Sequence, residues 1–139
     1  MREILTERID LWLEDPESTV EYAEDVDGRW AVRMRQGVRD ATTVWFEIGE
    51  RSLMYEAYLM PAPSDPTEVY RQALVRNNTT WRVFFALDRE GALLLRGRMA
   101  ASQVTIDELD RVLGEIYMMV EVAFRSMIRA GFPSRETSG

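Results

Sequence analysis

The sequence predicts an α+β domain in which helices cover one face of a mainly antiparallel sheet. Three observations lead to this fold class: three segments carry apolar residues at helical spacing, the other segments alternate with period two, and turn residues join the alternating segments into hairpins. The predicted order is helix, four strands, helix, two strands, helix. We expect a single domain over residues 2–132, large enough to bury about two-thirds of its unfolded surface, followed by a disordered tail over residues 133–139.

The first predicted element is a helix over residues 2–14, because its apolar residues recur every three or four positions. Pro16 stops further growth, since proline is not tolerated in a helix interior. The apolar stripe of this helix consists of Ile4, Leu5, Ile9, Trp12 and Leu13.

Three short turns are expected to join the strand segments into hairpins. Residues 25–28 and 88–91 each open with Asp and end with Gly, which fits a three-residue loop in which glycine accepts a positive φ angle. Gly49 and Glu50 fit a two-residue loop. Each turn implies a register that keeps apolar residues on one face, and three consistent registers indicate an antiparallel sheet. The predicted cross-strand pairs are Tyr22 with Val32, Phe46 with Leu53, Phe85 with Leu95 and Phe84 with Arg96.

Two further helices are predicted from their capping residues. Asp65 is a good N-cap and Pro66 suits the first helical position, and the helix that follows ends near the paired asparagines at positions 77 and 78. The last helix begins after Thr105, which has capping-box spacing to Glu108, and ends at Gly131 before a phenylalanine and a proline.

Gly114 interrupts the last helix at a cost of about 1 kcal/mol relative to alanine. Our hypothesis is that another backbone segment or an aromatic ring crosses the helix at this point. Met118, Met119 and Val122 lie outside the apolar stripe of the same helix, and methionine-rich surfaces adapt to varied partners.

The composition excludes most catalytic chemistry. The chain contains no histidine, cysteine or lysine, and all 17 of its basic residues are arginine. The absent types supply most general bases near neutral pH, most soft metal ligands and most amine or thiol nucleophiles. We therefore expect a protein that is not an enzyme and holds no cofactor or metal. Two alternatives stay open: a small-ligand sensor with a pocket between helices and sheet, and a hydrolase that uses two carboxylates across a cleft.

The charge is concentrated at one end of the chain. The net charge is −7, and residues 1–28 carry ten acids against two arginines. A field of this sign repels phosphate, so we expect no nucleic-acid partner. No apolar run approaches the roughly 20 residues that span a bilayer, and the chain starts without a signal-peptide core. The sequence therefore predicts a cytoplasmic protein without membrane attachment.

The third and fourth strand segments are apolar on both faces. Trp45, Met54 and Tyr58 alternate with the positions assigned to the core. Strands of this kind are usually buried on both faces, and an apolar outer patch otherwise marks an interface. Either a helix of the same chain or another chain is expected to cover these three side chains.

Arginines flank this outer patch in the predicted sheet. The register of the last hairpin puts Arg82 opposite Arg98 and places Arg96 on the same face. Like charges directly opposed are destabilising by about 0.2–1 kcal/mol unless they are neutralised. Glu47 and Glu56 could neutralise them within the chain; the alternative is an anionic partner segment, which arginine suits through its two-pronged geometry.

The order of elements and three motifs resemble the YbjN family, whose members are often labelled bacterial sensory transduction regulators. The motifs are LVRNN at residues 74–78, FALDREG at residues 85–91 and VTIDELDRVLG at residues 104–114. The resemblance implies a fold similar to that of the class I type III secretion chaperones, small dimeric proteins that hold extended segments of their clients. It carries over no catalytic residues.

These observations together predict a protein-binding module, an adaptor or a chaperone-like regulator that forms a homodimer. Its outer sheet face would bind a polypeptide partner through apolar anchors flanked by arginines. The predicted partner-binding residues are Trp45, Met54, Tyr58, Arg82, Arg96 and Arg98.

Overall fold

Six strands form one antiparallel sheet in the computed structural model, which describes residues 1–133. The order across the sheet is β1-β2-β3-β4-β6-β5. The strands are β1 (Val20–Val26), β2 (Arg29–Arg35), β3 (Ala41–Ile48), β4 (Ser52–Met60), β5 (Phe84–Leu87) and β6 (Leu93–Ala100).

The described residues also contain three α-helices: α1 (Arg2–Glu14), α2 (Pro66–Arg76) and α3 (Ile106–Gly131). Short 3₁₀ turns follow α2 (η1, Asn77–Thr79) and β6 (η2, Ala101–Gln103). The predicted fold class and the predicted order of elements are confirmed. Of the expected tail, residues 133–139, all but Pro133 lie outside the described residues.

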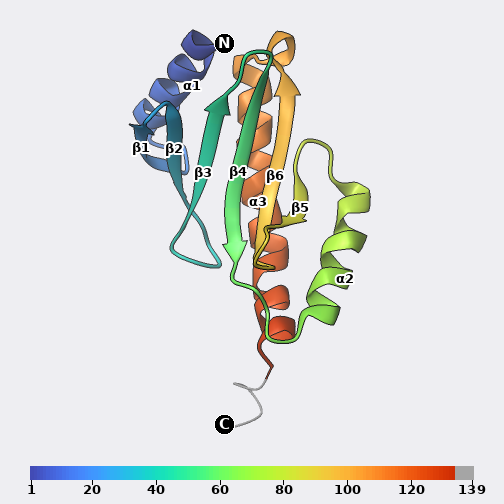
Figure 1. Ribbon diagram of the computed structural model, residues 1–139. Coiled ribbons are helices and arrows are strands. Elements are labelled where there is room, and N and C mark those ends of the chain that lie inside the picture. The colour runs from blue at the N-terminus through green and yellow to red at the C-terminus, as the bar shows by residue number, and fades with distance from the viewer. Residues whose placement is uncertain (134–139) are drawn as a thin grey trace.

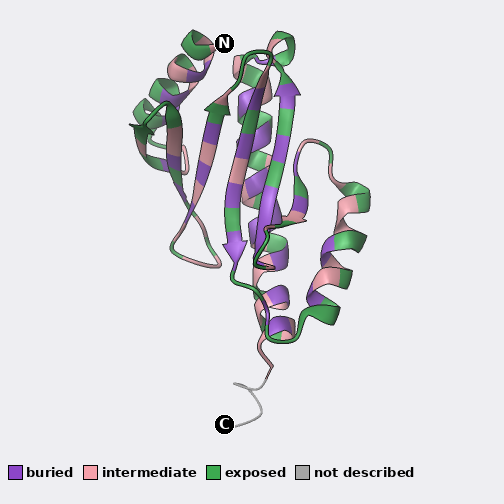
Figure 2. Cartoon of the chain, in the orientation of Figure 1, coloured by how far each residue is buried: buried purple, intermediate pink, exposed green. Residues whose placement is uncertain are grey.

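All three helices pack on the same face of the sheet. The long helix α3 runs behind β4 and β6, α1 lies at the β1 end and α2 beside β5 (Figure 1). The core between these layers is apolar and includes the ring contact of Trp12 with Phe46, whose centroids lie 6.4 Å apart. Buried positions alternate with intermediate or exposed ones along β3, most of β4 and the second half of β6 (Figure 2), as expected for strands buried on one face.

Helix ends follow the predicted caps only in part. The side-chain oxygen of Thr105 accepts a hydrogen bond from the backbone N–H of Glu108 at 3.0 Å, so the N-cap of α3 is confirmed. Asp65 precedes α2 as predicted, but its side chain makes no capping hydrogen bond. Leu13, assigned to the apolar stripe of the first helix, is exposed.

The β1–β2 hairpin closes with a tighter turn than predicted. Asp27 and Gly28 both have positive φ angles, 54° and 87°, and form a two-residue turn of the kind that Asp-Gly favours. Tyr22 therefore pairs with Arg33 and is exposed, and the predicted pairing with Val32 is wrong. A register shift between Val20 and Tyr22 restores the predicted pairing at the start of β1, where Val20 lies opposite Met34 and is buried in the core.

The β3–β4 register differs from the prediction by two residues. Phe46 pairs with Tyr55, not with Leu53, because the backbone N–H of Gly49 bonds the carbonyl of Ser52 at 2.8 Å and moves the loop forward by one residue. Side chains alternate with period two, so a shift of two keeps every residue on its predicted face. The core assignment of Phe46 and Leu53 therefore survives the error in register.

The β5–β6 hairpin has the predicted register. Phe85 pairs with Leu95 and Phe84 with Arg96, and Gly91 closes the loop with a φ angle of 88°. On the outer side of β5 the side chain of Asn77 takes the place of a further strand. Its amide donates to the carbonyl of Phe85 at 3.1 Å and its oxygen accepts from the N–H of Phe85 at 2.8 Å.

The hypothesis that another segment crosses α3 at Gly114 is wrong. A Cβ built at Gly114 meets no atom within 4 Å other than its own helix and chain neighbours, so nothing requires glycine there. At Gly97 of β6 the opposite holds, since a Cβ would overlap the carbonyl oxygen of Arg82 and the ring of Tyr55.

We predict that Gly114→Ala raises the free energy of unfolding by about 1 kcal/mol, the difference in helix propensity between the two residues. Gly97→Ala serves as the contrast and lowers stability, because its methyl group displaces backbone atoms. Urea denaturation followed by circular dichroism measures both. A destabilised Gly114→Ala variant contradicts the prediction.

Candidate functional site

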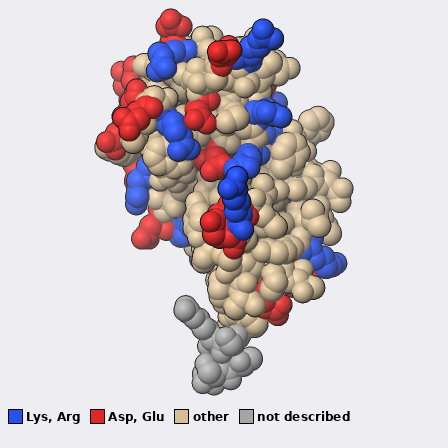
Figure 3. Space-filling model, in the orientation of Figure 1, with Lys and Arg blue, Asp and Glu red and all other residues tan. Residues whose placement is uncertain are grey.

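The sheet face opposite the helices is not covered by any element of residues 1–133 (Figure 1). We call it the open face. Figure 3 views it and shows basic and acidic side chains side by side at its centre, next to a broad area without charged groups. Over β2 to β6 the open face includes Arg29, Ala31, Arg33, Arg35, Ala41, Thr43, Trp45, Glu47, Ser52, Met54, Glu56, Tyr58, Phe84, Ala86, Leu94, Arg96, Arg98 and Ala100.

Strand pairing arranges these side chains in rows that cross the sheet. One row, which we call the end-arginine row, runs Arg29, Glu47, Met54, Arg98 over β2, β3, β4 and β6. The neighbouring row, which we call the central row, runs Ala31, Trp45, Glu56, Arg96, Phe84 and ends on β5.

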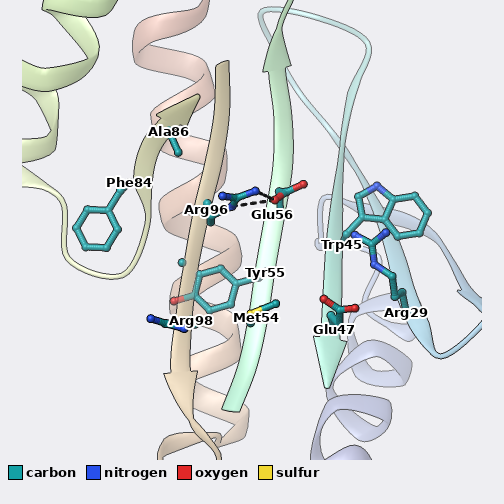
Figure 4. Close-up of a pocket in the computed structure, with 11 residues that line it drawn as sticks. Arg29, Trp45, Glu47, Met54, Tyr55, Glu56, Phe84, Ala86, Arg96 and Arg98 are labelled. Atoms are coloured by element: carbon teal, nitrogen blue, oxygen red, sulfur yellow. Dashed lines mark hydrogen bonds and ion pairs between the residues drawn. The ribbon is translucent and has the colours of Figure 1, made fainter. Parts of the chain in front are cut away.

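A shallow groove of about 710 Å³ follows these two rows. Figure 4 shows Phe84 at one side of it, Trp45 at the other, and Met54 between them. Met54 is 41% and Phe84 47% exposed, values that are high for large apolar side chains on a sheet. The groove therefore offers apolar surface that water reaches.

The charges in the groove are only partly neutralised within the chain. The Nε of Arg96 donates to the carboxylate of Glu56 at 2.9 Å, which is the internal pairing that the sequence left open. The guanidinium of Arg29 lies over the ring of Trp45, 4.7 Å from its centroid. Arg98 makes no ion pair with any residue of the described chain.

Four of the six predicted partner-binding residues line the groove: Trp45, Met54, Arg96 and Arg98. Tyr58 is on the same face and 52% exposed, but it lies opposite Leu94 and outside the groove.

Arg82 does not belong to the open face. β5 begins only at Phe84, so the predicted pairing of Arg82 with Arg98 is wrong. The guanidinium of Arg82 instead binds the carboxylate of Glu108 on α3, with Nε···Oε2 at 2.9 Å and Nη2···Oε1 at 3.2 Å. This ion pair removes the like-charge opposition that a longer β5 would create.

Three hydrogen bonds hold the backbone of Trp81 and Arg82, just before β5, out of the sheet. The carboxylate of Glu115 accepts from the backbone N–H of Trp81 at 2.9 Å and of Arg82 at 2.8 Å. The hydroxyl of Tyr55 donates to the carbonyl of Arg82 at 2.8 Å, and burial raises the pKa of Tyr55 to about 12. This contact fills the space above Gly97.

Arg29 and Phe84 line the groove but were not predicted as binding residues. The predicted register already put Phe84 opposite Arg96, so its position on this face could have been used. Arg29 is the first residue of β2, and its place opposite Glu47 follows only from the β2–β3 register. The interaction of Arg29 with Trp45 has no local sequence signal.

Two carboxylates line the groove, as the hydrolase alternative requires. Acid catalysis depends on a carboxyl group that burial keeps protonated. Glu47 is exposed, and Glu56 is bonded to Arg96, so this pair suits recognition of charge better than proton transfer. Among the described residues no three acidic side chains gather as a cation site. Asp25 stabilises the β1–β2 turn, since its carboxylate accepts from the N–H of Gly28 at 2.9 Å.

None of the helices in the described chain is long and apolar enough to cross a bilayer.

Comparison with known families gives a match to the YbjN model, described as "Putative bacterial sensory transduction regulator", over residues 6–129. An uncharacterized protein of Mycobacterium leprae is 37% identical over 117 residues, which are 82% of this chain and 64% of that protein. An uncharacterized protein of Mycobacterium tuberculosis is 40% identical over 88 residues, which are 63% of this chain and 48% of that protein. The chain thus spans about half to two-thirds of the length of the curated relatives that it matches.

Two solved structures have a similar fold. A chain of the HopA1-SchA chaperone-effector complex aligns with a TM-score of 0.59 and 12% identity, covering 91% of this chain and 94% of that one. A chain of the heterodimeric ExoU-SpcU complex from the type III secretion system of Pseudomonas aeruginosa aligns with a TM-score of 0.52 and 20% identity, covering 73% and 84%. At these identities the likeness establishes the fold alone.

We predict that the ion pair of Glu108 makes stability pH-dependent. Hydrogen bonds from Arg82 and then from Arg111 lower the pKa of Glu108 from 4.5 to about 2. The folded state therefore favours the ionised form of this carboxylate more than the unfolded state does. The stabilisation that ionised Glu108 gives to the fold is complete above about pH 4.5 and is lost as the pH falls toward 2.

Glu108→Gln should lower the free energy of unfolding by about 1 kcal/mol at pH 7, and the difference should shrink between pH 4.5 and pH 3. Thermal unfolding at several pH values measures it, with Glu90→Gln in the exposed β5–β6 turn as the matched removal of one carboxylate. A difference between wild type and Glu108→Gln that stays constant over this range contradicts the assignment.

Proposed function

This chain belongs to the YbjN family, and from that premise we propose that it is a non-enzymatic protein-binding module, an adaptor or chaperone-like regulator that acts in the cytoplasm. The observation that carries the proposal is the open face. A sheet face with an exposed groove, apolar anchors and arginines, left without a covering helix in residues 1–133, is a surface that another polypeptide can bury.

The partner we propose is a polypeptide segment with both apolar and acidic side chains. Trp45, Met54 and Phe84 supply aromatic and aliphatic contact area, the kind of side chains that dominate binding energy at interfaces. Arg29 and Arg98 supply positive charge at the edges of the same groove. The fold similarity to chains of chaperone-effector complexes supports a protein partner over a small ligand.

A small-ligand sensor has less support. It needs a pocket between helices and sheet, and the facing side chains there, such as Phe46, Leu53 and Ile116, are fully buried against one another.

We include a homodimer in the proposal. Exposed apolar side chains on α2 and α3, Leu74, Val75, Met118 and Val122, lie away from the open face, and a second copy of the chain can cover them. This arrangement leaves both open faces available to partners.

We predict that Trp45→Ser/Phe84→Ser reduces partner recovery at least tenfold, because two aromatic anchors of the central row are removed and each is worth about 1 kcal/mol or more. Affinity purification from the native host with quantitative mass spectrometry measures it. Leu11→Ser/Leu13→Ser, two exposed residues of α1 outside both proposed contact surfaces, is the matched control, and circular dichroism verifies that each variant is folded. Equal recovery of all partners by wild type and the open-face variant rules out this face.

We predict a solution mass of twice the chain mass of 16.1 kDa. Met118→Glu/Val122→Glu should convert the protein to monomers, since it puts four carboxylates into the proposed dimer contact. Light scattering after size-exclusion chromatography gives the mass. A monomeric wild type contradicts the dimer and leaves the open-face proposal intact.

A further inference from the structure

Three arginines line the groove, and the two in the end-arginine row have no acidic partner within residues 1–133. Arg35 lies on the same face but outside the groove, and its guanidinium donates to the backbone carbonyl of Ser18 at 3.1 Å. Arg33 on the same face is paired with Glu21 at 3.1 Å, and Arg96 is paired with Glu56. Arg29 stacks on Trp45, and no carboxylate of the described chain lies within 4.0 Å of its guanidinium.

Glu47 leaves these arginines available although it stands in the same row. It is directly opposite Arg29 in the β2–β3 pairing, yet the two side chains form no ion pair in the described chain. The guanidinium of Arg29 is instead held over the ring of Trp45 (Figure 4). Positive charge therefore stands at both ends of the row, with Glu47 and Met54 between.

Strand spacing sets the distance between the two ends. The row crosses from β2 to β6 over three strand spacings of about 4.8 Å, so the backbones of Arg29 and Arg98 are about 14 Å apart. An extended chain rises about 3.3 Å per residue, and its side chains return to the same face at every second position. Positions i and i+4 of an extended segment thus match the two arginines.

We propose that the open face binds an extended segment that crosses the strands and carries two acidic residues four positions apart, with an apolar residue midway. The carboxylates meet Arg29 and Arg98, and the middle side chain rests on Met54. The charge of Glu47 disfavours a third carboxylate at the centre. This proposal rests on the protein-binding function above and adds to it the chemistry and spacing of the bound segment.

Selection from random nine-residue peptides displayed on phage tests this directly. The immobilised chain of residues 1–139 is compared with Arg29→Gln/Arg98→Gln, which keeps the apolar anchors. It is also compared with Arg51→Gln/Arg89→Gln, which removes two exposed arginines from turns outside the groove. Enriched peptides are then synthesised and their affinities measured at 50 mM and 300 mM NaCl.

Wild type and the turn variant should enrich peptides with the acid–x–apolar–x–acid spacing. Loss of the end arginines should abolish that enrichment and weaken the synthesised peptides about tenfold, with most of their salt dependence lost. Enriched peptides without this spacing, or unchanged selection by Arg29→Gln/Arg98→Gln, overturn the proposal. If peptides without the spacing bind wild type but not Trp45→Ser/Phe84→Ser, the open face still binds polypeptides and only the acidic spacing fails. If the enriched peptides bind Trp45→Ser/Phe84→Ser as well as wild type, the open-face binding function and the acidic spacing both fail.

Discussion

Packing of α3 against one face of β4 and β6 determines which side chains the sheet can present. Ile116 and Val120 of the helix and Leu53 and Leu95 of the strands are fully buried, so the alternate residues of those strands must point the other way. The helices α1 and α2 extend the same layer toward the two edges of the sheet. The open face is therefore a direct consequence of having all helices on one side, and its composition decides how the chain meets other molecules.

The fold was largely readable because its signals are local. The Thr105 cap, the β5–β6 turn and the alternating strands each depend on residues close in sequence. The β1–β2 turn was misassigned because the predicted three-residue loop ends on Asp27 and Gly28, a pair that favours a two-residue turn with two positive φ angles. The error of two residues at the β3–β4 loop did no damage to the core assignment, since the period of a strand is two.

The site was less predictable because it depends on pairs that are distant in sequence. Alternation was enough to find Trp45 and Met54. The partner of Arg82 on α3 lies 26 positions away, and nothing near Arg82 points to it. Gly114 and Gly97 look alike in the sequence as interruptions of regular elements. Only the packing distinguishes a glycine with free space around it from one that a tyrosine ring and a carbonyl group press against.

The amide of Asn77 has a consequence for the solution behaviour of the protein. Sheets with a free outer strand tend to recruit further strands and grow into fibrils. Asn77 bonds the N–H and the carbonyl of Phe85 and so blocks the β5 edge of the sheet. The acidic residues of β1 make the opposite edge repel the same edge of another copy. A protein that displays aromatic groups can in this way remain soluble at high concentration, because its binding surface is confined to one sheet face and neither edge strand is open to pairing.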